Sequence, residues 1–195
     1  MCKVRLASFA ILAATLLVGV RAWAAASDAD FVKAAASGGM LEVDLGRFAA
    51  THASDPAVRA FGQRMVSDHS KANQELISVA QRQGLTVPSQ LEAADLAKLH
   101  QLSKLRGAAF DKAYMDAMVK DHEKDVAEFR AQAGRQKSDV DRWAAKTLPT
   151  LEEHLSQAKA VAERVARNDS VQRIREKGPD DRRPDPTEPD LPTRI

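Results

Sequence analysis

Three acid–histidine pairs are the residues of this 195-residue chain whose types and spacing could support chemistry. The segments 65–71 (MVSDHSK) and 118–124 (MVKDHEK) share five of seven residues, and Glu153-His154 repeats the pair later in the chain. His69, His122 and His154 each lie three or four residues from apolar positions of an expected helix. Each side chain is therefore predicted to point close to the core.

Glu42 holds the same kind of position in the first expected helix, so four helices each present one ionisable side chain to the core. Burial of such groups is costly unless they pair with one another or bind a cation. Imidazole and carboxylate groups suit zinc, iron, manganese or copper, and a helical bundle is a known frame for such sites. The spacing predicts a transition-metal site with these ligands: Glu42, His69, His122 and His154.

The acidic neighbours of the histidines, Asp68, Asp121 and Glu153, are expected to add ligands or to accept hydrogen bonds from the ligating rings. Adjacent helical residues project about 100° apart, so only one member of each pair can point squarely inward. Two simpler interpretations therefore stay open. The cluster could be satisfied by hydrogen bonds alone, or these residues could lie mainly at the surface.

The sequence supports no particular catalytic reaction and leans against an enzyme. The di-iron carboxylate pattern needs Glu-x-x-His on two helices. The residues three positions before the five histidines are instead Ala49, Val66, Ala97, Val119 and Leu151. The sequence also contains no glycine-rich phosphate loop and no His-Glu-x-x-His motif. We predict no catalytic residue, and we expect His52 and His100 at the surface.

Helical periodicity, without any strand-like alternation, runs through most of the chain. We expect helices at 28–52, 56–83, 91–105, 108–134 and 138–167, with serine or aspartate caps and Pro56 at their starts. Pro149 is expected to kink or divide the last helix, and Gly38-Gly39 to mark a close backbone approach or a bend. The predicted fold class is all-α: an antiparallel four-helix bundle with an extra short helix before the third long helix.

Residues 1–26 have the features of a secretory signal peptide, with cleavage expected near Ala24 or Ala26. Removal would take three basic residues and no acidic ones, changing the formal net charge from +2 to −1, which gives no support for nucleic-acid binding. It would also remove the only cysteine, Cys2, and with it any disulfide or thiolate ligand. Residues 27–167 would form the helical domain of a periplasmic or otherwise exported protein. Residues 168–195, charged and rich in proline, would form a disordered tail.

Several motifs together resemble the bacterial DUF4142 family. They are GGMLEVDLG at 38–46, the two MV-x-DH segments, FDKAY at 110–114, and TLPTL at 147–151 followed by His154. The resemblance covers about residues 28–165. It implies an exported protein with a ferritin-like helical bundle, in which Glu42, His69, His122 and His154 are family motif positions. No established activity comes with it.

Two functions from different classes follow. The first is a bundle that binds a transition metal through histidine and carboxylate groups. The second is a non-catalytic envelope protein that supports the cell surface or binds a partner protein, with the polar cluster fixing the register of the helices and the tail as partner-binding element. The positions of the four predicted ligands distinguish the two functions. A metal site requires them to converge around one point, because its ligands must surround one ion.

Overall fold

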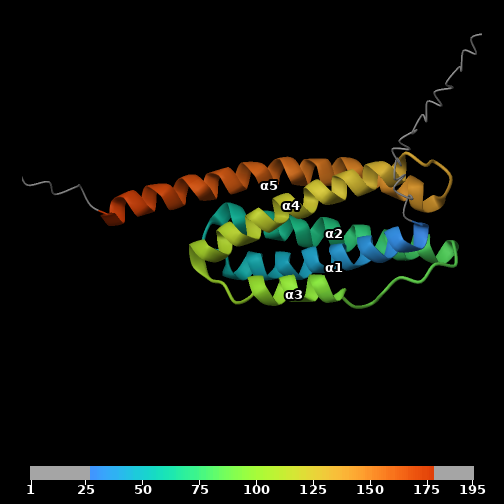
Figure 1. Cartoon of the computed structure of the whole chain (residues 1–195), viewed down its shortest axis with the longest axis horizontal. Helices are drawn as coiled ribbons and strands as arrows, with labels where there is room; N and C mark the ends of the chain where they lie inside the picture. Colours follow the sequence, from blue (N-terminus) through green and yellow to red (C-terminus); the bar gives the residue numbers. More distant parts are fainter. Residues whose placement is uncertain (1–26, 178–195) are drawn as a thin grey trace, which may run out of the picture.

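The computed structural model describes residues 27–177, and within this range the chain has five helices and no strand. The helices are α1 (Asp28–His52), α2 (Pro56–Arg82), α3 (Ala93–Leu102), α4 (Gly107–Ala133) and α5 (Asp139–Lys177) (Figure 1). The prediction of an all-α fold is confirmed for these residues. The predicted signal peptide and residues 178–195 of the predicted tail lie outside the described residues.

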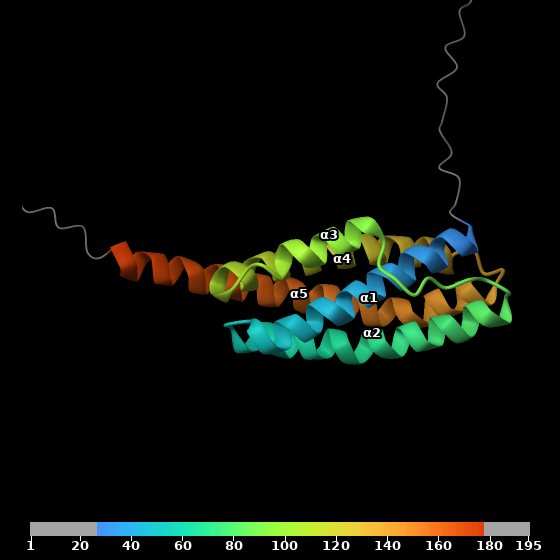
Figure 2. The same cartoon turned by 90° about the horizontal axis from the view of Figure 1, so that it is seen from below.

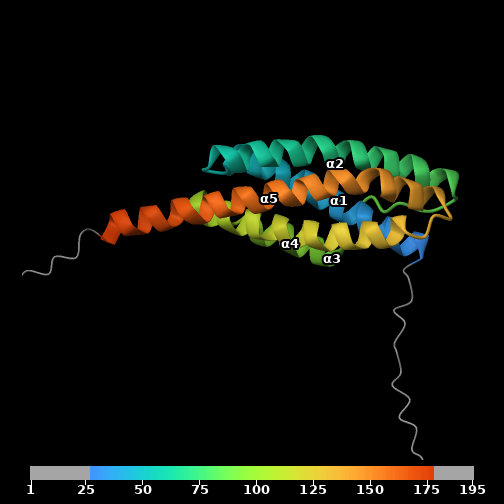
Figure 3. The same ribbon diagram turned by 90° about the horizontal axis from the view of Figure 1, so that it is seen from above.

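The four long helices lie alongside one another, and α3 packs on α1 (Figure 1, Figure 2). α1 packs mainly against α2, and α4 mainly against α5, while contacts of α2 with α5 and of α1 with α4 join the two pairs. Seen from above, opposite to the view of Figure 2, α5 lies between α2 and α4 (Figure 3). Among the described residues, no helix has the length and apolar character needed to cross a bilayer.

Side-chain caps explain where the long helices begin. At the start of α1, Ser27 Oγ accepts a hydrogen bond from the Asp30 N–H at 3.1 Å, as part of a capping box. Asp55 caps α2 directly before Pro56. Ser138 Oγ accepts from the Asp141 N–H at 3.1 Å before α5. These starts agree with the sequence prediction because each depends on local residues.

Asp111 of α4 holds the turn between α1 and α2. Its buried carboxylate accepts hydrogen bonds from the backbone N–H groups of Ser54, at 2.9 Å, and Asp55, at 2.7 Å. Backbone donors removed from water need such acceptors. This side chain therefore ties α4 to the α1–α2 pair.

A polar layer divides the apolar core into two clusters. One cluster includes Phe61, Met65, Tyr114 and Met118, and the other includes Leu76, Val126, Phe129 and Trp143. In each of α2, α4 and α5, a buried histidine lies between the residues of one cluster and the residues of the other. These histidines are His69, His122 and His154, so the predicted site residues lie at mid-length of the core.

α1 and α2 approach each other closely at Gly46 and Gly62. A Cβ atom on either glycine would lie 2.7 Å from the carbonyl oxygen of the other, so neither position has space for a side chain. The close backbone approach expected at Gly38-Gly39 therefore occurs further along α1. A Cβ on Gly39 would clash with the Asn73 side chain, and a Cβ on Gly38 would meet nothing within 4 Å.

Pro149 lies inside α5 and does not divide it, so of the two expected effects, a kink or a division, the division is wrong. α5 also continues past the expected end near 167 to Lys177 (Figure 1). Residues 168–177, which the sequence assigns to the tail, are therefore helical. A polar composition prevents a separate core, but extension of an existing helix needs no new nucleus. The Asp169–Arg173 ion pair, at 3.0 Å, supports the added turns.

Candidate metal centre

Three buried histidines from three helices meet in the polar layer. The ring centroids of His69 of α2, His122 of α4 and His154 of α5 are 5.3 to 5.7 Å apart. One nitrogen of each ring lies within 4.8 Å of one nitrogen of each other ring. The exposed fractions of the three residues are 6%, 0% and 0%. The structure thus brings together the three histidines that the sequence placed near the core.

One nitrogen of each ring contacts a hydrogen-bond acceptor. The acceptors are the Met118 carbonyl oxygen for His122 Nδ1 at 2.9 Å, Glu42 Oε2 for His69 Nδ1 at 3.0 Å, and Asp68 Oδ2 for His154 Nε2 at 2.9 Å. A carbonyl or carboxylate oxygen only accepts, so these nitrogens carry the protons. In a neutral ring, the other nitrogen then holds a lone pair.

The three remaining nitrogens have no hydrogen-bond partner among the described residues. They are Nε2 of His69, Nε2 of His122 and Nδ1 of His154. Buried polar atoms are normally paired, and each unpaired one costs about 1–3 kcal/mol. A metal ion that accepts three lone pairs would satisfy all three nitrogens together.

Glu42 of α1 contacts the proton-bearing nitrogens of two rings. Besides its bond to His69, its Oε1 lies 3.4 Å from His122 Nδ1, without the geometry of a hydrogen bond. The sequence predicts Glu42 as a fourth ligand. Its carboxylate lies beside the nitrogens that donate, a position that also suits orienting the rings.

Charge and burial set the protonation of the cluster. Burial alone would raise the pKa of Glu42, but His69 and His122 outweigh it and lower that pKa to about 2. Burial lowers the pKa of His69, but the Glu42 carboxylate raises it above its usual value. Burial, helped by the other two histidines and opposed by Asp68, lowers the pKa of His154 to about 4. His154 is therefore neutral at pH 7, the form that binds metals.

Asp68 and Glu153 lie on the outer side of His154. Asp68 accepts from His154 and also from Arg64, at 3.2 Å. Arg64 in turn pairs with the exposed Glu153 at 2.8 Å. Asp68 thus orients the His154 ring directly, whereas Glu153 is linked to Asp68 only through Arg64.

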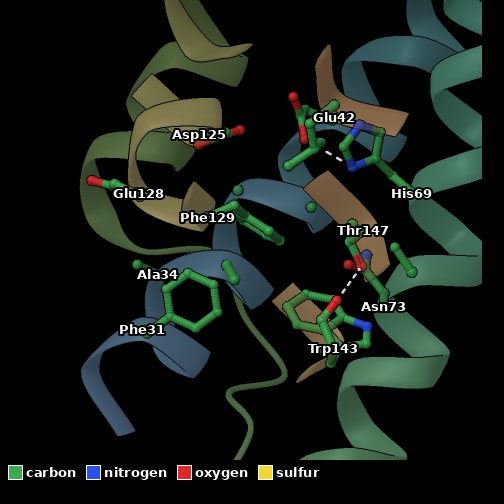
Figure 4. Close-up of a pocket in the computed structure, with 15 residues that line it drawn as sticks. Phe31, Ala34, Glu42, His69, Asn73, Asp125, Glu128, Phe129, Trp143 and Thr147 are labelled. Carbon is green, nitrogen blue, oxygen red and sulfur yellow. Dashed lines mark hydrogen bonds and ion pairs between the residues drawn. The ribbon is translucent and has the colours of Figure 1, made fainter. Parts of the chain in front are cut away.

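Asp125 of α4 is a site residue that sequence reasoning missed. It lines the same cavity as Glu42 and His69 (Figure 4), and burial together with the Glu42 charge raises its pKa well above the usual value. A carboxylate three residues after His122 lies on the same helix face, and that spacing was the available signal. Asp121, which precedes His122 directly, pairs instead with Lys98 of α3 at 2.6 Å.

A cavity of about 30 Å³ adjoins the cluster and is lined by residues of α1, α2, α4 and α5. Figure 4 shows Glu42 and His69 joined by their hydrogen bond on one side, with Asp125 of α4 across from them. Phe129 and Trp143 line the part of the cavity further from the cluster. This volume is enough for a water molecule.

Comparison with known proteins gives a family and a fold. The crystal structure titled "Crystal structure of DUF305 fragment from Deinococcus radiodurans" superposes with a TM-score of 0.62 at 15% identity, covering 70% of this chain and 95% of that chain. This likeness supports the helical fold alone. No curated protein matches the sequence. The family model "Domain of unknown function (DUF4142)" matches residues 19–161, a stretch that includes all three histidines and Glu42. The chain therefore belongs to the DUF4142 family.

Proposed function

We propose that this protein binds one transition-metal ion through His69, His122 and His154. The observation that carries the proposal is a group of three buried, closely packed histidines, each of which has one ring nitrogen without a hydrogen-bond partner among the described residues. Glu42 and Asp68 hold two of the rings in the ligating tautomer, and a backbone carbonyl holds the third.

The donor set narrows the choice of metal. Three neutral imidazoles favour zinc or copper(II) over iron and manganese. In a tetrahedral zinc site, Zn–N bonds of ~2.0–2.1 Å place the nitrogens roughly 3.3 Å apart. One nitrogen of each ring lies within 4.8 Å of one nitrogen of each other ring, so small shifts of the rings would complete such a site. Three protein ligands leave a position for water or another small ligand.

The proposal includes the setting of the site. We infer an antiparallel four-helix bundle of ferritin-like arrangement, supported by the four long helices lying side by side (Figure 1). We also infer that the protein is exported, supported by the signal-like residues 1–26. The ion would then be acquired outside the cytoplasm.

Metal analysis tests the function. The full chain, purified without a polyhistidine tag, is loaded with zinc or copper(II), desalted and analysed by mass spectrometry of the elements. We expect close to one equivalent of metal in the unmodified protein and a large loss in His122→Leu. His100→Ala, which removes an exposed histidine of α3, is the matched control and should keep the metal.

A content below about a tenth of an equivalent in the unmodified protein would refute metal binding, because a preformed three-histidine site retains its ion through desalting. That result would favour the alternative of a non-catalytic envelope protein whose polar layer only fixes the helix register. Equal metal content in His122→Leu and the unmodified protein would place the ion elsewhere.

A further inference from the structure

The cavity beside the histidine cluster reaches His69. Its buried lining includes Glu42 and His69, whose Oε1 and Nε2 atoms have no hydrogen-bond partner among the described residues. Two other lining residues, Ala34 of α1 and Glu128 of α4, are exposed. The cavity lining therefore includes exposed residues of α1 and α4 as well as the buried side chains of Glu42 and His69 (Figure 4).

Gly38 leaves the α1 side of this cavity open. It lines the cavity, and a Cβ atom there would meet nothing within 4 Å. Glycine inside a helix is less favourable than alanine by about 1 kcal/mol. A packing contact explains Gly46, but no such contact explains Gly38. The absence of a side chain at position 38 does, however, keep the opening wide.

The cavity lining carries acidic groups and no lysine or arginine. Apart from His69, its ionisable residues are Glu42, Asp125 and Glu128. Glu128 is paired with Lys124 and Glu42 with His69, both at 3.0 Å, so Asp125 is the remaining acidic group of the lining. A carboxyl group in such an opening binds a cation by releasing its proton.

We propose that this cavity is the path by which a divalent transition-metal cation reaches and leaves the three histidines, with Asp125 binding the cation on the way. This inference rests on the proposed metal-binding function. A cavity of about 30 Å³ has room for water but not for a fully hydrated cation. Carboxylate oxygens of Asp125 and then Glu42 therefore replace water around the cation as it moves inward, and bulky chelates are excluded.

Rates of metal binding test the path. The full chain, without a tag, is mixed rapidly with cobalt(II), and binding is followed by quenching of tryptophan fluorescence in a Trp23→Phe background, which leaves Trp143 of the cavity lining as the emitter. Gly38→Leu and Ala34→Leu place a side chain in the opening without changing a proposed ligand. Ala127→Leu adds the same side chain at an exposed position of α4 outside the cavity and is the control.

A side chain that obstructs the path should slow the entry and the exit of the metal ion by the same factor. Gly38→Leu and Ala34→Leu should slow association and dissociation by the same factor and leave Kd within about twofold of the unmodified value. Asp125→Asn should slow association severalfold, because an amide cannot exchange a proton for the cation as the carboxyl group does. The Ala127→Leu control should keep the original rates.

Two outcomes overturn the proposal, and they are distinguishable. Unchanged rates in both cavity leucine variants, with normal metal content, would refute the path and leave the histidine site standing. Failure of the unmodified protein to bind cobalt(II) would refute the site and the path together.

Discussion

Zinc should stabilise the folded protein with a concentration dependence that reports the number of sites. One cluster of three histidines predicts one site. An ion that binds only the folded state raises the free energy of unfolding by RT ln(1 + [Zn]/Kd). Above Kd, each tenfold increase in free zinc therefore adds about 1.4 kcal/mol. For a helical domain of this size, that increment raises Tm by roughly 3–6 °C.

Thermal unfolding followed by circular dichroism, in buffers that fix free zinc over several decades, measures this slope. The Tm of His122→Leu should not depend on zinc, because His122 belongs to the buried cluster. The Tm of His100→Ala should keep the original slope, because His100 is exposed on α3. A Tm of the unmodified protein that does not change with zinc would refute the reasoning. The same slope in His122→Leu would refute the assignment of the ligand.

Three further predictions concern pH, helix contact and the turn. The pKa of His154 is lowered to about 4 from an unfolded value of about 6.5, so the unfolded chain takes up this proton first. Stability without metal should therefore contain a component that falls as the pH decreases from about 6.5 to about 4, and His154→Leu should remove that component in urea titrations. Gly46→Ala should lower the free energy of unfolding by about 1–3 kcal/mol, since its Cβ would meet a carbonyl oxygen of α2. Gly38→Ala should raise the free energy of unfolding by up to about 1 kcal/mol, because its Cβ would meet no atom. Equal effects of the two substitutions in denaturant titrations would contradict the close contact at Gly46. Asp111→Ala should lower the free energy of unfolding by at least about 2 kcal/mol in the same titrations, because two hydrogen bonds to the turn are lost. Asp116→Ala, at an exposed position of α4, should lower it by less than about 1 kcal/mol. Similar losses in the two variants would contradict the role of Asp111.

The starts of the helices could be predicted from the sequence, but not all of their ends. Ser27, Pro56 and Ser138 act on their immediate neighbours, so their effect is visible in the sequence. α3 ends at Leu102, before the expected 105, and α5 continues past 167. An end depends on whether the next turn gains a contact or loses one. Pro149 is tolerated within α5 because the helix is packed on both sides of it, and one missing hydrogen bond does not divide it.

The direction of the three histidines could be predicted, but the acid partner of each could not. The facing of a helical side chain follows from local spacing. The partner depends on which helix lies opposite, so Asp68 bonds His154 of α5 and not its own neighbour His69. Lys98 of α3 likewise draws Asp121 away from His122. Sequence spacing alone contains no information about these pairings between helices.

The three histidines come from both halves of the chain, His69 from the α1–α2 pair and His122 and His154 from the α4–α5 pair. An ion bound by all three would act as a reversible cross-link between the two halves. In a chain cut between α2 and α3, within residues 83–92, the apolar clusters that include residues of both halves would hold the two fragments together, and the metal would strengthen their association. The affinity of one fragment for the other would then rise with the metal concentration.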